Sequence, residues 1–217
     1  MLTRRVAIVS AAAAAAACSA EPALSAAPAA PAAPGDMSLG SAKAPIHMVE
    51  YLSLSCPHCA HFHAEVWPAF KAKYVDTGRV YFTIRELLTA PAQVAAAGFL
   101  MARCKGDATS YFKIVDEVFD SQSRWQQGNI KPIFVEIAKK NGLTEAQFEA
   151  CITDEKGQDA LQKRLEYATG TDKVTGTPTF FVNGVQLPNQ DVPTLADLDA
   201  AIAKAAKSAQ SKSGGRR

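Results

Sequence analysis

Cys56-Pro57-His58-Cys59 is the most informative motif of the sequence. It follows a short apolar run at 46–52, which has β-branched and aromatic members and predicts a strand. Apolar residues at helical spacing come after the second cysteine and predict a helix. The two cysteines are therefore expected where a strand ends and the N-terminus of a helix begins.

A cysteine at the start of a helix lies over unpaired backbone N–H groups and the positive end of the helix dipole. Both favour the thiolate, so we expect a depressed pKa for Cys56, the attacking or attacked sulfur. His58 adds a partial positive charge, and Pro57 is tolerated because its missing N–H costs little near a helix start. Cys59 is expected to be more buried and to act as the resolving thiol. The motif indicates dithiol–disulfide exchange, in which a stabilised thiolate makes the disulfide a stronger oxidant.

A zinc site is one alternative use of this region. Cys56, Cys59, His61 and His63 supply four soft or borderline ligands. A helix start directs the later histidines along the helix and away from a common tetrahedral point, so we expect no metal. His61 and His63 are predicted instead to be solvated helix residues. A purely structural, strained disulfide within the motif is the other alternative.

Downstream of this motif the pattern predicts a second strand at 79–85, followed by helices throughout 91–168 that are broken at glycines. Thr144 with Gln147 is typical of a helix-capping box. The individual helices are expected at 92–104, 111–119, 131–140, 144–152 and 160–168.

The C-terminal part begins with two short β-rich runs that flank Asn183-Gly184, the dipeptide of a tight hairpin. A last helix is expected from about 194 to 206, before a disordered tail. The order strand–helix–strand, several helices, hairpin and helix favours an α/β domain with an all-helical insertion.

Composition excludes several classes of protein. The 217 residues carry a formal charge of only +2, which gives no electrostatic case for a nucleic-acid partner. No uninterrupted apolar run reaches the roughly 18–20 residues of a spanning helix. The sequence therefore indicates a soluble protein with one well-packed domain.

The N-terminal 36 residues differ from the rest of the chain. Arg4 and Arg5 precede a short apolar stretch and then small residues, which is the order of a secretory signal peptide. We expect a signal peptide at 1–26 and a Pro/Ala linker at 27–36, with a twin-arginine route or a lipid anchor at Cys18 as open alternatives. Removing Cys18 with the signal leaves four of five cysteines, an even number suited to an oxidising compartment.

The sequence resembles the thioredoxin-fold thiol oxidoreductases of the DsbA type. The CPHC tetrapeptide is typical of that family, and a second stretch about 120 residues later resembles its cis-proline loop and hairpin: Gly176-Thr177-Pro178-Thr179-Phe180-Phe181-Val182-Asn183-Gly184. The resemblance implies a thioredoxin fold with an inserted all-helical subdomain. Its parts would be a first thioredoxin part at 37–90, the helical insertion at 91–168, a second thioredoxin part at 169–207 and a tail at 208–217.

The resemblance also implies roles for individual residues. Pro178 would be the cis-proline beside the cysteines, and the backbone of Thr177 would pair with an extended substrate. Glu50 would be the buried acid that relays a proton to or from Cys59. Its charge partner would be Arg85 or Lys73, two residues between which the sequence does not decide.

Cys104 and Cys151 depart from the plainest pattern of the family. Both fall at the ends of predicted helices of the insertion. Some members are said to carry a second, structural disulfide there, and the resemblance implies one between these two residues. Closing such a loop would stabilise the fold by roughly 4 kcal/mol on the chain-entropy model. Two free buried thiols are the alternative.

The function implied by the resemblance is that of an exported, periplasmic oxidase. It would pass the Cys56–Cys59 disulfide to folding proteins through a mixed disulfide on Cys56, with no cofactor besides that pair. A membrane quinone-coupled oxidase of the DsbB type would reoxidise it. The alternatives are an isomerase or reductase of the same fold and a metal-binding or chaperone-like protein. A monomer is expected, because only a Pro/Ala linker precedes the first strand.

Overall fold

The structure is a computed structural model that describes residues 32–125, 128–188 and 192–214. The predicted signal peptide and Cys18 lie outside these residues. No helix within the described ranges is long and apolar enough to cross a membrane. In chain order the elements are β1 (Met37–Leu39), β2 (Ile46–Leu52), α1 (Pro57–Glu65), α2 (Trp67–Phe70), η1 (Lys71–Val75, π-helical), β3 (Val80–Glu86), α3 (Ala92–Arg103), α4 (Ala108–Asp120), α5 (Gln122–Trp125), α6 (Ile130–Lys140), α7 (Glu145–Thr153), α8 (Glu155–Glu166), η2 (Tyr167–Thr171, π-helical), β4 (Thr179–Val182), β5 (Val185–Gln186) and α9 (Leu195–Gly214).

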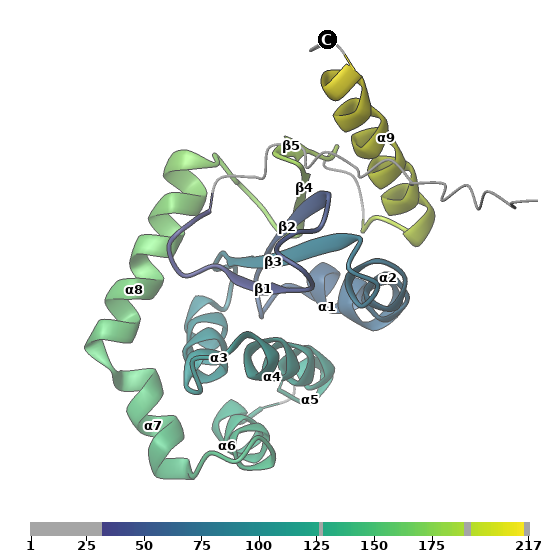
Figure 1. Cartoon of the computed structure of the whole chain (residues 1–217). Coiled ribbons are helices and arrows are strands. Elements are labelled where there is room, and N and C mark those ends of the chain that lie inside the picture. Colours follow the sequence, from purple (N-terminus) through teal and green to yellow (C-terminus); the bar gives the residue numbers. More distant parts are fainter. Residues whose placement is uncertain (1–31, 126–127, 189–191, 215–217) are drawn as a thin grey trace, which may run out of the picture.

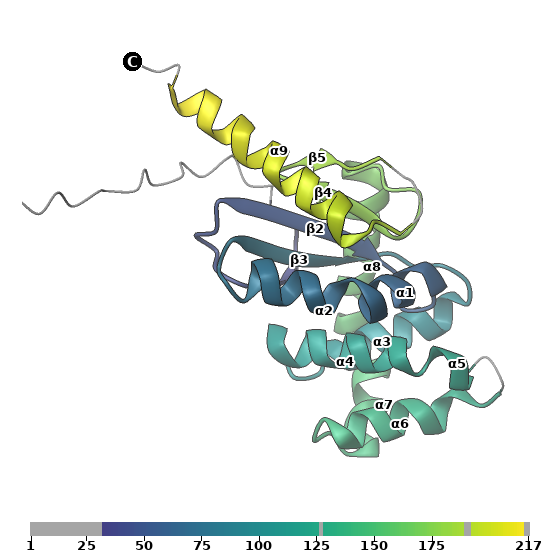
Figure 2. The same cartoon turned by 90° about the vertical axis from the view of Figure 1, so that its right-hand side faces the viewer.

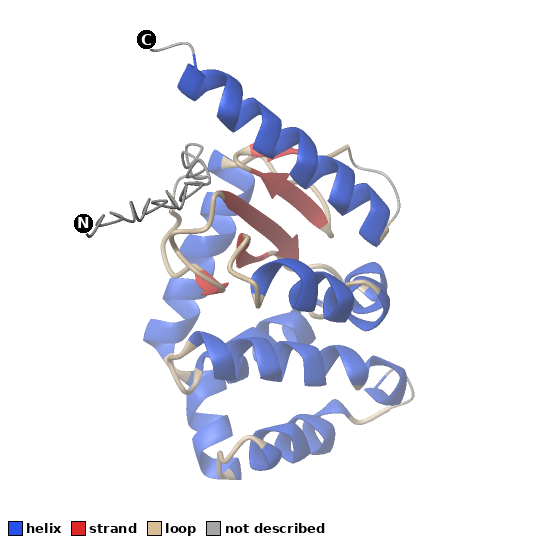
Figure 3. Ribbon diagram, turned by 45° about the vertical axis from the view of Figure 1, so that its right-hand side comes forward, coloured by secondary structure: helices blue, strands red, loops and turns tan. Residues whose placement is uncertain are grey.

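The strands of the described residues form one mixed sheet in the order β1-β3-β2-β4-β5. β2 and β3 are parallel, and the remaining pairs are antiparallel. β2 lies between β3 and β4 and carries helices on both faces, which explains why it is an almost continuous apolar run. Figure 3 shows the strands in one half of the molecule and helices alone in the other.

Alternate residues of β2 belong to two different cores. Met48 and Leu52 pack with Phe62 of α1 and Leu198 of α9 in the main core, which continues into the helices α3 to α8. Tyr51, which points to the opposite face, belongs to a smaller cluster with residues of η2 and the segment after it. Figures 1 and 2 place α6 and α7 at the end of the molecule opposite α9.

Several local predictions are confirmed. Thr144 and Gln147 form both hydrogen bonds of the capping box at the start of α7. Asn183 and Gly184 both have positive φ, 48° and 77°, in the tight turn between β4 and β5. Beyond these predictions, the helix after the cysteines is interrupted one residue after Glu65, just before the turn that contains Pro68.

The structure differs from the predictions at several places. α8 begins at Glu155 and runs through Gly157, where a break was expected, and α5 was not predicted. β1, which pairs with β3 through Ser38 and Thr83, was not predicted, because a three-residue edge strand has too little periodicity. β3 ends at Glu86, one residue beyond the predicted strand. The tail predicted as disordered from 208 is wrong as far as Gly214, because Ala, Lys, Ser and Gln continue α9 there.

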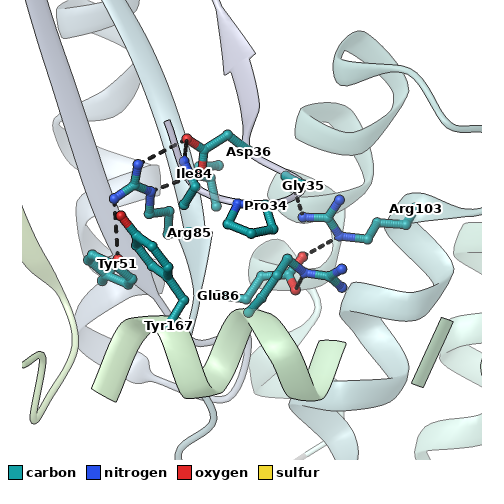
Figure 4. Close-up of a pocket in the computed structure, with 11 residues that line it drawn as sticks. Pro34, Gly35, Asp36, Tyr51, Ile84, Arg85, Glu86, Arg103 and Tyr167 are labelled. Carbon is teal, nitrogen blue, oxygen red and sulfur yellow. Dashed lines mark hydrogen bonds and ion pairs between the residues drawn. The ribbon is translucent and has the colours of Figure 1, made fainter. Parts of the chain in front are cut away.

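A buried ionic cluster joins the helices to the sheet at the end of β3 (Figure 4). Glu86 accepts a hydrogen bond from Arg103 of α3 at 2.6 Å, from Arg164 of α8 at 2.6 Å and from the hydroxyl of Tyr111 of α4 at 3.1 Å. Both carboxylate oxygens are therefore engaged. We call these four residues the Glu86 cluster.

Arg85 points to the opposite face of the sheet from Glu86. Its guanidinium bridges Asp36, at 2.9 Å, and Asp172, at 2.7 Å, and Tyr51 donates to the same Asp172 carboxylate at 2.6 Å. Asp36, the last residue of the predicted linker, is thus tied to the sheet.

A disulfide connects the helices of the insertion. Cys104 follows α3 and Cys151 lies in α7, with an S–S distance of 2.10 Å and a Cα–Cα distance of 5.8 Å. The link closes a loop of 47 residues around α4 to α6.

Candidate active site

Cys56 and Cys59 are free thiols at the N-terminus of α1. The backbone N–H of Cys56 donates to Ser53 O at 3.0 Å, which turns the chain from β2 into the helix. Cys56 is the N-cap residue, and its sulfur accepts a hydrogen bond from the backbone N–H of Cys59 at 3.3 Å. Pro57 and His58 are exposed at the helix start. The sulfur of Cys56 is thus placed over the unpaired N–H groups of the first helical turn.

The two cysteines have opposite electrostatic environments. A hydrogen bond with the side-chain thiol of Cys59, helped by Thr177 and by the backbone N–H groups of Cys59 and His58, lowers the pKa of Cys56 to about 6 against the opposing effect of burial. Burial, the contact with Cys56 and the charge of Glu50 raise the pKa of Cys59 well above its ordinary value. Near neutral pH Cys56 is therefore largely a thiolate, the form that can attack or leave in thiol–disulfide exchange, and Cys59 holds its proton.

The loop before β4 lies against the first cysteine. The Thr177–Pro178 peptide bond is cis. As a thiol, Cys56 donates to the carbonyl oxygen of Thr177 at 3.4 Å. The structure thus places Cys56 against Thr177, 121 residues later in the sequence, and its neighbour Pro178.

The helical insertion holds the active-site loop in place. Gln122 of α5 is buried, and its side-chain amide donates to the carbonyl oxygens of Leu54, at 2.9 Å, and Cys56, at 3.2 Å. The sequence analysis missed this residue, because one glutamine in a helical segment gives no sign of its tertiary contacts.

Glu50 lies beneath the cysteines on β2 and is fully buried. Its Oε2 is 3.1 Å from Nε2 of His63 in α1, and Nδ1 of His63 is 2.8 Å from Asp116 of α4. Burial raises the pKa of Glu50, while the adjacent His63 opposes that effect. Burial alone would lower the pKa of His63, but the charges and hydrogen bonds of Glu50 and Asp116 raise it to about 9.

These contacts correct two predictions. His63 is not a solvated helix residue but is buried, because it faces Glu50 and the core side of α1, whereas His61 is exposed. Neither Arg85 nor Lys73 is the charge partner of Glu50. Arg85 binds Asp36 and Asp172 on the other face of the sheet, and Lys73 pairs with Asp199 on the surface.

The four residues considered for zinc do not gather as a metal site. Within the described parts of the chain, no group of three or more His, Cys, Asp or Glu side chains is placed to hold a metal ion. The ring nitrogens of His63 face Glu50 and Asp116 instead.

The site combines a low-pKa cysteine, a buried second cysteine and an adjacent cis-proline loop on a mixed sheet with an inserted helical subdomain. These features define a thioredoxin-fold protein built for thiol–disulfide exchange. Comparisons with known proteins agree with this class. A family model described as thioredoxin matches residues 32–204.

Relatives of this chain carry names from disulfide chemistry. A putative protein-disulfide oxidoreductase of Rickettsia bellii is 34% identical over 178 residues, which are 82% of this chain and 67% of that protein. A probable disulfide bond formation protein D of Bacillus anthracis is 28% identical, over 73% of this chain and 74% of that one. The chain spans less than two thirds of the length of further rickettsial relatives.

Solved structures resemble the whole described domain. Alpha-DsbA1 of Wolbachia pipientis matches with a TM-score of 0.73 and 29% identity, covering 83% of this chain and 96% of that one. BdbD of Bacillus subtilis shares the fold. It matches with a TM-score of 0.71 and 21% identity, covering 84% of this chain and 98% of that one. The chain belongs to the thioredoxin family, among its DsbA-type protein-disulfide oxidoreductases. The predicted fold class and enzyme class are confirmed.

Proposed function

We propose that this protein is an exported thiol oxidase that donates a Cys56–Cys59 disulfide to folding proteins. The single observation that carries the proposal is the pKa of Cys56, lowered to about 6. A thiolate stabilised in the dithiol form favours that form over the disulfide, so the disulfide is a strong oxidant. Cys56, once attacked, is also a good leaving group for the second half of the exchange.

The exchange proceeds in two balanced steps. A substrate thiolate attacks Cys56 Sγ, the Cys56–Cys59 bond breaks, and Cys59 leaves as a thiolate that takes up a proton. A second substrate thiolate then attacks the substrate sulfur of the mixed disulfide, and Cys56 leaves as a thiolate. The substrate loses two electrons and forms one disulfide, and the enzyme gains them as a dithiol. The high pKa of Cys59 means that it needs a proton donor, a role that fits the buried carboxyl group of Glu50.

The substrate would bind beside the cis-proline loop. The backbone of Thr177 lies against the Cys56 sulfur, which supports pairing of an extended substrate strand with this residue. His58 and Pro57 are exposed at the same helix start, where an incoming chain would meet them.

Export and reoxidation belong to the same proposal. The signal-like residues 1–26 support delivery to the periplasm, an oxidising compartment in which the exchange is useful. A DsbB-like membrane oxidase, coupled to quinone, would restore the disulfide after each turnover.

Trapping the mixed disulfide tests the proposal. Incubating the Cys59→Ser variant with a reduced two-cysteine peptide and an oxidant should accumulate a protein–peptide adduct through Cys56, because the resolving thiol is gone. Cys56→Ser is the matched control and should form none. If Cys59→Ser yields no adduct, or if Cys56→Ser yields as much, the assigned roles are wrong.

A further inference from the structure

Three side chains form a continuous line from the core beneath the cysteines to the surface. Glu50 is 0% exposed, and its Oε2 lies 3.1 Å from Nε2 of His63, whose side chain is 2% exposed. Nδ1 of His63 lies 2.8 Å from Asp116, whose side chain is 41% exposed. The line therefore begins at a carboxylate shielded from water and ends at one that water reaches.

The His63 ring is held in this orientation by aromatic neighbours. The ring centroid lies 4.7 Å from that of Phe119, 5.7 Å from that of Trp67 and 5.6 Å from that of Phe62. With these rings packed around it, each ring nitrogen faces one carboxylate, so the imidazole joins the two without having to rotate.

The buried end of the line, at Glu50, lies next to the two cysteines. Glu50 Oε1 is buried and has no hydrogen-bond partner among the described residues, so this oxygen is free to take or give a proton. The titratable groups around His63 are Glu50 from β2 and Asp116 from α4. Two thiols lie near Glu50: the charge of Cys56 raises the pKa of Glu50, and the charge of Glu50 raises the pKa of Cys59.

We propose that His63 and Asp116 are positioning residues that form the outward arm of a proton relay, through which Glu50 exchanges the Cys59 proton with solvent. The proposal rests on the exchange function proposed above and adds its proton route. Neither residue touches the reacting sulfurs, and each acts through Glu50.

The relay accounts for every proton both when the Cys56–Cys59 disulfide forms and when it opens. When Cys59 attacks a mixed disulfide on Cys56, its proton passes to Glu50 and the imidazolium of His63 releases its Nδ1 proton to solvent by way of Asp116. When Cys59 leaves as a thiolate, the carboxyl group of Glu50 gives it the proton. A solvent proton that arrives at Asp116 then passes to Nδ1 of His63. His63 is an imidazolium whenever Glu50 is ionised and neutral whenever Glu50 is protonated. The core therefore never holds a carboxylate without a countercharge.

The relay is tested by the kinetics of ring closure, by which we mean formation of the Cys56–Cys59 disulfide. Reduced protein reacts with oxidised glutathione in two steps: attack by Cys56 on glutathione, and attack by Cys59 on the resulting mixed disulfide. We expect His63→Gln and Asp116→Asn to slow the second step about tenfold at neutral pH and to shift its pH profile, because a positioned proton acceptor contributes about 10²-fold or more and Glu50 itself remains. The first step should stay within about twofold, because it needs no proton from Cys59.

Matched variants separate the relay from a loss of folding. His61→Gln changes an exposed histidine on the same helix and should leave both steps unchanged. Asp116→Asn changes a partly exposed side chain, keeps a hydrogen-bonding oxygen and should fold, and Asp116→Glu should restore the rate. If ring closure in Asp116→Asn has the rate and pH profile of His61→Gln, the relay is wrong while the exchange function stands. If the wild-type protein fails at the first step, the exchange function itself is wrong.

The pKa of His63 in the two redox forms is a second readout, because a purely structural contact would leave it the same in both. Followed by NMR of the ring nitrogens, His63 should hold its proton to a higher pH in the dithiol form than in the disulfide form, because only the former has taken a proton from solvent through the ring. Equal titration midpoints in the two redox forms would overturn the relay.

Discussion

Two glutamates lie buried near the ends of neighbouring parallel strands, Glu50 on β2 and Glu86 on β3, and they are held differently. The register pairs Glu50 with Ile84 and Leu52 with Glu86, so both carboxylates point to the same face of the sheet. Glu86 binds two arginines and a tyrosine hydroxyl with both of its oxygens. Glu50 meets one histidine, and its other oxygen has no hydrogen-bond partner in the parts of the chain that the structure describes.

The difference shows how one fold uses a buried carboxylate for two purposes. Arginine holds its proton at every accessible pH, so the Glu86 cluster is a permanent charge pairing that fastens α3 and α8 to the sheet. Histidine, unlike arginine, can lose its proton within the accessible pH range, and the pKa of His63 is about 9, so the pair formed by Glu50 and His63 can change its charge when the charges of the nearby cysteines change. We therefore expect the first arrangement to serve stability and the second to serve the proposed exchange chemistry.

The largest effect on stability is expected from Glu86→Gln. It leaves the guanidinium groups of Arg103 and Arg164 without their buried countercharge, and breaking a buried ion pair in this way costs about 3–5 kcal/mol. Urea unfolding of the oxidised protein measures this loss. The exchange rate of the folded protein should be unchanged, and a loss of stability below about 1 kcal/mol would remove the contrast with Glu50.

Glu50→Gln should show the opposite balance. Losing the proton acceptor for Cys59 should slow ring closure by about 100-fold. The free energy of unfolding should change by less than about 1 kcal/mol, because His63 keeps Asp116 as a partner and, unlike an arginine, can release its proton. Stopped-flow oxidation by glutathione measures the rate, and urea unfolding measures the stability. A variant that is strongly destabilised but closes its disulfide at the normal rate would make Glu50 a structural residue like Glu86.

A smaller effect is expected on the titration of Cys56. The pKa of Cys56 is lowered chiefly by its hydrogen bond with the side-chain thiol of Cys59, so Cys59→Ala, which removes that thiol but keeps the backbone N–H, should raise it from about 6 toward the ordinary value near 9. The thiolate fraction at pH 6 should fall about fivefold or more. Because the folded pKa is depressed, the stabilisation of the dithiol form is fully present above pH 9 and is lost as the pH falls through about 6.

Thiolate absorbance near neutral pH measures this titration. Cys59→Ser is the matched variant, since its hydroxyl group can still donate a hydrogen bond, and its titration midpoint should lie between those of wild type and Cys59→Ala. An unchanged midpoint in Cys59→Ala would mean that the helix start and the Thr177 loop alone set the pKa of Cys56.

The smallest effect is expected from Lys73→Met. Lys73 and Asp199 form an exposed ion pair at 2.7 Å, and such pairs contribute little because water screens them. Urea unfolding should show no measurable change, and ring closure should proceed at the wild-type rate. A slowed ring closure in this variant would show that Lys73 acts on Glu50 after all.

The sequence predicts the parts of the site that are local or carried by a motif. Cys56 and Cys59 follow a β-branched run and precede a helical period, and Asn183-Gly184 identifies the hairpin beside the cis-proline loop. These features depend on neighbours within a few residues, so their physical cause is visible in the chain itself.

The remaining parts depend on contacts between distant segments. His63 meets Asp116 across 53 residues, and the Gln122 side chain reaches the Cys56 carbonyl across 66. His61 and His63 look alike in a single sequence, because the side of α1 that faces Glu50 is set by packing against α4. The partner of Glu50 was predicted among cations on or near β3, whereas the register sends Arg85 to the opposite face.

The reduction potential of the Cys56–Cys59 pair tests whether a stabilised Cys56 thiolate and a protonated Cys59 make this protein a disulfide donor. Equilibration of the purified protein with glutathione buffers measures it. We predict a value near about −120 mV, as for strongly oxidising members of this class. A value near about −270 mV, typical of thioredoxin-like reductants, would contradict the claim and reverse the direction of electron flow through the same two cysteines.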